Sequence, residues 1–197
     1  EMQRSLVGSE MCIRDSIYIA VMGISIKRDM QYHIIAFKDV IVSILAGYMM
    51  IPMVLFINNV SMLFSKNYLE AASQTLLTYP FVVQIILMAV IPALVEEFIF
   101  RGLFYGTYRK CGILKGALMS GLVFGLFHLN INQFCYAFVI GVVFAFLVEA
   151  TGSIWSSVLA HFAINTYSIT IIQLLKITGT YLSLIHISEP TRLRCIS

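Results

Sequence analysis

Long uncharged runs alternate with short polar connections along the chain. The runs without Asp, Glu, Lys or Arg are residues 40–64, 81–95, 116–148 and 154–175. A helix needs roughly 20 apolar residues to cross the hydrocarbon core of a bilayer. The polar residues Asn130–Gln133 divide the third run into two helices, and Pro92 predicts a kink in the second run. Because the runs are continuously apolar and do not alternate, they predict an all-α bundle of transmembrane helices and not a β-barrel.

The composition indicates that lipid surrounds these helices. Hydrophobic residues make up 59% of the chain and charged residues only 12%, whereas a soluble domain carries about 25% charged residues. One globule of 197 residues cannot hide so much apolar surface from water. The sequence also lacks a basic stripe and a Gly-rich phosphate loop, which argues against nucleic acid or nucleotides as partners. We therefore predict a multi-pass integral membrane protein whose main partner is the lipid bilayer.

The basic residues of the connections indicate how the helices are oriented. Alternate connections lie on the same side of the membrane. One set of connections holds Lys27, Arg28, Lys38, Arg109, Lys110 and Lys115, and the other set holds Lys66 and Lys176. Because cytoplasmic loops carry an excess of Lys and Arg, we expect the first set to be cytoplasmic.

The two ends of the chain are related to each other through DNA. Residues 6–15 read LVGSEMCIRD and residues 182–192 read LSLIHISEPTR, and one DNA sequence read on its two strands encodes both strings. That DNA resembles a transposase adapter used in sequencing libraries. We therefore expect residues 1–16 and 182–197 to be adapter-derived, and we exclude them from fold reasoning. Residues 17–181 are then expected to be a truncated membrane domain.

Three ionisable residues, Glu96, Glu97 and Arg101, follow the second apolar run directly. An ionisable side chain inside a span costs about 2.5–3.5 kcal/mol on insertion scales, so such residues usually have a function. On a helix, Glu97 and Arg101 stand at i and i+4, in the favourable order for an ion pair. Glu96 is rotated by about 100° from Glu97. The spacing predicts one carboxylate held by a structural arginine and another free to act in a cavity.

Polar residues in two later helices complete a possible hydrolytic site. His128 follows Phe124 at i+4 near the end of one helix, and Asn165 follows His161 at i+4 in the last helix. A glutamate can take a proton from water, and a histidine can stabilise an oxyanion or protonate a leaving amine. One carboxylate and two imidazoles can also ligate a metal ion with an open position for water. From the residues alone, both kinds of chemistry stay open.

The motifs EEFIFR, FGLFH and HFAIN, which begin at Glu96, Phe124 and His161, resemble the three motifs of the CPBP family. This family comprises CAAX prenyl proteases and bacteriocin-processing or immunity proteins of the Abi type. The resemblance covers about residues 80–167. It implies an intramembrane endopeptidase of a bacterial cytoplasmic membrane, acting on a peptide or protein substrate.

The resemblance also implies roles for individual residues. Glu96 would activate water, and Asn165 would stabilise the oxyanion. His128 and His161 would share catalysis, or would bind Zn²⁺ together with Glu96. Supporting roles would fall to Glu97, Arg101 and Phe124.

Two other functions are compatible with the same sequence. A non-catalytic immunity or chaperone-like protein could keep this fold without cleaving anything. A proton-coupled transporter could use Glu96, His128 and His161 as a relay. The relay would spread the three side chains along a path, whereas an active site would gather them around one cavity.

Overall fold

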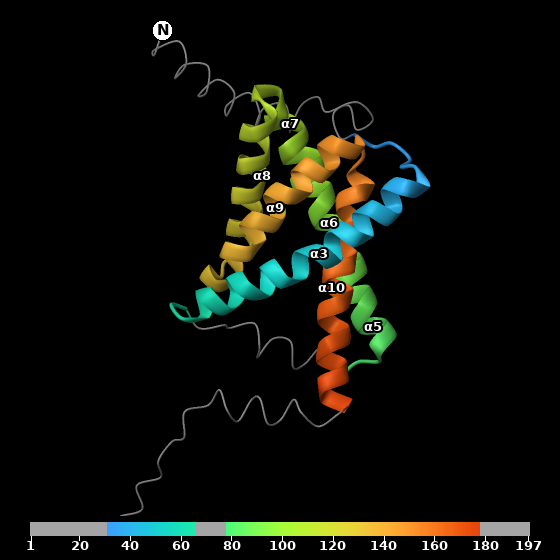
Figure 1. Ribbon diagram of the computed structural model, residues 1–197, viewed down its shortest axis with the longest axis vertical. Helices are drawn as coiled ribbons and strands as arrows, with labels where there is room; N and C mark the ends of the chain where they lie inside the picture. Colours follow the sequence, from blue (N-terminus) through green and yellow to red (C-terminus); the bar gives the residue numbers. More distant parts are fainter. Residues whose placement is uncertain (1–30, 66–77, 178–197) are drawn as a thin grey trace, which may run out of the picture.

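All regular elements in the computed structural model, which describes residues 31–65 and 78–177, are helices (Figure 1). The single helices are α3 (Phe37–Met62), α8 (Ile113–Phe127), α9 (Ile131–Thr151) and α10 (Ile154–Ile177). A further helical run, Phe81–Cys111, contains α5 (Phe81–Ile85), η1 (Ile86–Val90), α6 (Ile91–Glu97), η2 (Phe98–Tyr105), α7 (Gly106–Tyr108) and η3 (Arg109–Cys111). The predicted adapter-derived ends, 1–16 and 182–197, lie outside the described residues.

The described helices confirm the predicted fold class. Within the described residues, α3, the run Phe81–Cys111, α9 and α10 are the four helices long and apolar enough to cross a membrane. The helix α8 is apolar but shorter, with 15 residues. It is separated from α9 at Asn130, whose side-chain Oδ1 accepts a hydrogen bond of 3.1 Å from the Asn132 backbone N–H and caps α9. The protein is therefore an all-α, multi-pass integral membrane protein.

The run Phe81–Cys111 contains two π-helical stretches on either side of the glutamate pair. The first stretch, η1, ends just before Pro92, which cannot donate a backbone hydrogen bond and crowds the preceding turn. The second, η2, starts directly after Glu97. In η2, the Phe100 carbonyl accepts a hydrogen bond of 2.8 Å from the buried Ser120 hydroxyl of α8. The wider turns thus accommodate the proline, and α8 supports the backbone beside the glutamates.

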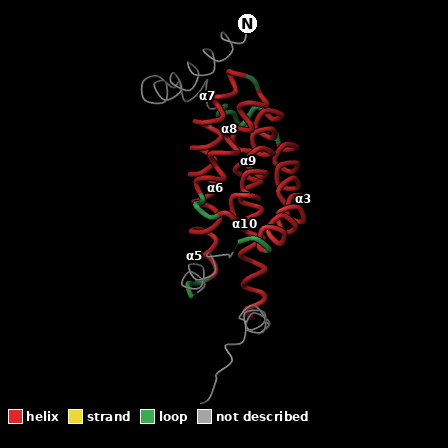
Figure 2. The backbone as a smooth tube through the Cα atoms, turned by 90° about the vertical axis from the view of Figure 1, so that its left-hand side faces the viewer, coloured by secondary structure: helices red, strands yellow, loops and turns green. Residues whose placement is uncertain are grey.

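Small residues allow the helices to pack closely. Figure 1 shows α3 crossing α10 obliquely, and in Figure 2 α9 and α10 lie between α3 and α6. A Cβ atom on Gly47 of α3 would stand only 2.5 Å from the Ala160 carbonyl oxygen of α10. A Cβ atom on Gly141 of α9 would stand 2.7 Å from the Gly121 Cα of α8. These glycines fix the distances between the helices that carry the polar residues.

Candidate active site

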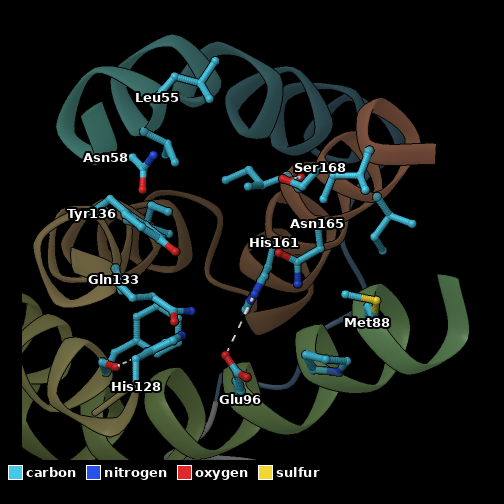
Figure 3. A pocket seen from close by; sticks show the side chains of 18 of the residues that line it. Leu55, Asn58, Met88, Glu96, His128, Gln133, Tyr136, His161, Asn165 and Ser168 are labelled. Carbon is cyan, nitrogen blue, oxygen red and sulfur yellow. Dashed lines mark hydrogen bonds and ion pairs between the residues drawn. The ribbon is translucent and has the colours of Figure 1, made fainter. Parts of the chain in front are cut away.

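A cavity of about 690 Å³ contains the candidate residues from all three motifs. Its walls come from α3, the run Phe81–Cys111, α8, α9 and α10. The lining includes the predicted residues Glu96, Phe124, His128, His161 and Asn165. Figure 3 shows Glu96, His128, His161 and Asn165 around the same space. The structure therefore brings these residues together, although they come from three separate helical segments.

The two adjacent glutamates have different surroundings. The side chain of Glu96 is 21% exposed and lines the cavity, whereas that of Glu97 is fully buried. The Arg101 Nη1 donates a hydrogen bond of 3.0 Å to the Glu97 Oε1, and both side chains are completely buried. The predicted pairing of Glu97 with Arg101 is confirmed, and so is the orientation of Glu96 towards a cavity.

His161 joins the two glutamates. Its Nδ1 lies 2.8 Å from the Glu97 Oε1, and its Nε2 lies 3.9 Å from the Glu96 Oε2. An ionised carboxylate can only accept hydrogen bonds, so the Nδ1–H of His161 donates to Glu97. This contact fixes the ring and leaves the Nε2 facing Glu96 and the cavity (Figure 3). The sequence spacing had indicated the pair with Arg101 but not this bond between helices.

His128 is held by its own helix. Its Nδ1 donates a hydrogen bond of 2.8 Å to the Phe124 carbonyl oxygen, one turn earlier. The chain leaves α8 directly afterwards, where Leu129 adopts a left-handed conformation with φ of 51°. Because the Nδ1 is occupied, the Nε2 is the nitrogen of His128 that is left for a ligand.

Phe124 packs between the two histidines and the buried arginine. Its ring centroid lies 4.9 Å from that of His128 and 6.0 Å from that of His161. The Arg101 guanidinium lies 4.3 Å from the Phe124 centroid and 5.3 Å from the centroid of Phe144. Cation–π contacts of this kind stabilise a desolvated arginine. Phe124 therefore contacts both histidines and the arginine, while its supporting role stays a prediction; Phe144 is a second aromatic contact of Arg101 that the motifs did not indicate.

A wall of the cavity outside the three motifs carries further polar groups. Asn58 of α3, together with Gln133 and Tyr136 of α9, lines the cavity with Asn165 (Figure 3). The sequence motifs did not indicate the first three as site residues, because charged residues and histidines were the signals that marked a site within the apolar runs. An amide inside an apolar run, such as Asn58, is the signal that could have found this wall.

A metal ion held by Glu96, His128 and His161 stays a prediction. Among residues 31–65 and 78–177, no three His, Cys, Asp or Glu side chains are grouped closely enough to hold one ion. This side-chain arrangement does not fit a three-residue zinc site. The chemistry proposed below therefore uses only the groups of the protein itself.

Comparison with known proteins shows what the segment that carries these residues is similar to. Residues 78–167 match the family described as type II CAAX prenyl endopeptidase Rce1-like. The matched segment contains all three motifs and nearly coincides with the predicted core, residues 80–167. Over these residues the chain is similar to membrane proteases of the CPBP type. The predicted resemblance to a family of membrane proteases is confirmed over the matched residues.

A curated member of similar sequence comes from Bacillus subtilis (strain 168) and carries the name "Putative membrane peptidase YdiL". It is 33% identical to this chain over 91 residues, which make up 46% of this chain and 37% of the relative. The chain thus spans little more than a third of that relative. No solved structure matches the chain significantly.

Proposed function

We propose that the protein is an intramembrane endopeptidase that hydrolyses peptide bonds with water activated by Glu96. The observation that carries this proposal is the shared cavity, which Glu96, His128, His161 and Asn165 all line. The match to a prenyl endopeptidase family and the similarity to a named peptidase support the same reaction class. A CAAX-protease-like activity is therefore the function that the site supports best.

In the proposed reaction, the Glu96 carboxylate takes a proton from a water molecule. The water oxygen attacks the carbonyl carbon of the scissile peptide bond, and the carbonyl oxygen becomes an oxyanion. The Asn165 amide N–H donates to this oxyanion, and a histidine that donates through its Nε2 adds to the stabilisation. The tetrahedral intermediate then collapses, the C–N bond breaks, and the leaving nitrogen receives the proton from Glu96.

The buried neighbours prepare the site for this reaction. The Glu97 carboxylate holds His161 through Nδ1 and keeps its Nε2 directed at the cavity. Arg101 balances the negative charge of Glu97, which would otherwise be buried without a partner. Outside the motifs, Asn58 and Gln133 also line the cavity and carry amides that can hydrogen-bond to the backbone of an extended peptide.

The alternatives make different use of the same groups. A proton relay is less well supported, because the ionisable residues surround one cavity instead of following a path through the bundle. If the protein is non-catalytic, it would use the same cavity to bind peptides without cutting them. Turnover by the purified protein separates this possibility from the proposal.

The test is cleavage of a fluorogenic peptide library by the full-length protein in liposomes. Glu96→Gln keeps the shape of the side chain and removes the base, so it should lower kcat about 100- to 10,000-fold without changing the melting temperature. Glu149→Gln is the matched control, because Glu149 binds Tyr105 and Arg109 away from the cavity. Cleavage by Glu96→Gln at the wild-type rate would remove Glu96 from the mechanism.

A further inference from the structure

The cavity occupies only one half of the helix bundle. Its lining residues fall within residues 54–62, 87–96, 124–140 and 161–172. These segments are the end of α3, the first half of the run Phe81–Cys111, the α8–α9 connection with the first half of α9, and the later part of α10. Because consecutive helices run in opposite directions, all of these segments share one end of the bundle (Figure 1).

The lining of the cavity reaches the helix ends at that same end. Met62 is the last residue of α3, His128 follows α8, and Gln133 is in the first turn of α9, and all three line the cavity. The ends of α3 and α9 are in contact there, since the Ser61 hydroxyl donates a hydrogen bond of 3.4 Å to the Asn132 carbonyl oxygen. The polar lining residues therefore reach the membrane face at this end of the helices.

The opposite end of the bundle carries most of the basic residues. Lys38 stands at the start of α3, Arg109 and Lys110 stand at the end of the run Phe81–Cys111, and Lys115 stands in the first turn of α8. Arg109 also donates a hydrogen bond of 2.9 Å to Glu149 near the end of α9, which confirms that these helix ends meet. In the described residues, Lys176 is the one Lys or Arg at the cavity end.

We infer that the cavity opens on the extracytoplasmic side of the membrane and takes polypeptides presented from that side. Basic helix ends stay in the cytoplasm, so the basic end of this bundle is cytoplasmic and the cavity end faces outwards. This location was not evident from the sequence, because the motif residues lie within the spans. Cleavage of the bound polypeptide at this site rests on the proposed function. The side on which the cavity opens does not rest on it.

The lining indicates which polypeptides fit. Leu87, Met88, Ile169 and Ile172 form an apolar wall between the run Phe81–Cys111 and α10, while Asn58 and Gln133 stand across the cavity. Apolar side chains of a bound segment would pack on the first wall, and its backbone groups would find hydrogen-bond partners on the second. The substrate class is therefore an exported or membrane-anchored polypeptide with an apolar segment close to the outer membrane surface.

The side of the opening is tested by labelling with a membrane-impermeant maleimide. Ile131→Cys places a thiol at the cavity end, where Ile131 is 73% exposed. Lys115→Cys places one at the basic end on an exposed residue. Both variants are made in the full-length protein, and the wild-type protein measures the background from the native cysteines. The maleimide should label Ile131→Cys in protoplasts and Lys115→Cys in inverted vesicles. The reverse pattern would overturn the inference.

A cleavage assay separates this inference from the proposed function. A peptide substrate is added either outside or inside right-side-out vesicles that contain the wild-type protein, with Glu96→Gln as the control. Cleavage only of the external peptide supports both proposals. Cleavage only of the enclosed peptide overturns the inference and leaves the protease proposal standing. If neither peptide is cut while the labelling pattern is as expected, the protease proposal fails and the side of the opening stands.

Discussion

The buried ion pair between Glu97 and Arg101 allows the sharpest test of how the site is supported. Arg101→Ala removes the hydrogen bond of 3.0 Å to Glu97 and leaves a fully buried carboxylate that still accepts a hydrogen bond from His161. It also removes the guanidinium that lies over the rings of Phe124 and Phe144. The variant therefore removes the positive charge of Arg101 and changes the packing of these two aromatic side chains.

The expected loss of stability is large. Breaking a buried ion pair by removing one partner costs about 3–5 kcal/mol, because the other charge is left buried. The lost cation–π contacts act in the same direction, at about 2 kcal/mol for a desolvated pair. In a domain of this size, each kcal/mol lowers the melting temperature by roughly 2–4 °C. The ion pair alone thus predicts a decrease of about 6–20 °C.

The assay is thermal unfolding of the purified full-length protein in detergent, followed together with peptide cleavage. Arg109→Ala is the matched control: its pair with Glu149 has side chains that are 28% and 22% exposed, and it should lose at most about 1 kcal/mol. The double variant Arg101→Met with Glu97→Gln removes both charges but keeps an acceptor for His161, so it should recover most of the stability. If Arg101→Ala unfolds at the wild-type temperature and loses only turnover, Arg101 belongs to the chemistry and the supporting role assigned to it is wrong.

Three further predictions concern the cavity and the packing that forms it. Asn165→Ala should lower kcat about 100- to 1,000-fold with an unchanged melting temperature, as measured with a fluorogenic peptide; full activity would exclude an oxyanion role. Asn58→Leu should raise KM about 2- to 10-fold with kcat unchanged, whereas Asn59→Leu, on the exposed side of the same helix, should change neither; equal KM values for both variants would contradict backbone binding by Asn58. Gly141→Ala places a Cβ 2.7 Å from the Gly121 Cα, so it should separate α8 from α9 and cost about 1–3 kcal/mol in unfolding experiments; wild-type stability would show that these helices are less tightly packed than described.

The sequence by itself determined the helices and the candidate residues. Uncharged runs predicted α3, α9 and α10 within a few residues of their ends, because in lipid the backbone must satisfy its own hydrogen bonds. The helical period also predicted different surroundings for Glu96 and Glu97, since both residues lie on one helix and their directions follow from its geometry. Information of this kind is local, and a single segment is enough to provide it.

Only the tertiary structure decided which groups meet between helices. The bond from His161 to Glu97, the position of Phe124 beneath Arg101 and the polar wall around Asn58 all depend on how deeply neighbouring helices interlock. That depth is set by close contacts such as Gly121 against Gly141, which no periodic pattern in one segment specifies. For the same physical reason, the half of the bundle that contains the cavity became evident only when the five helical segments were placed together.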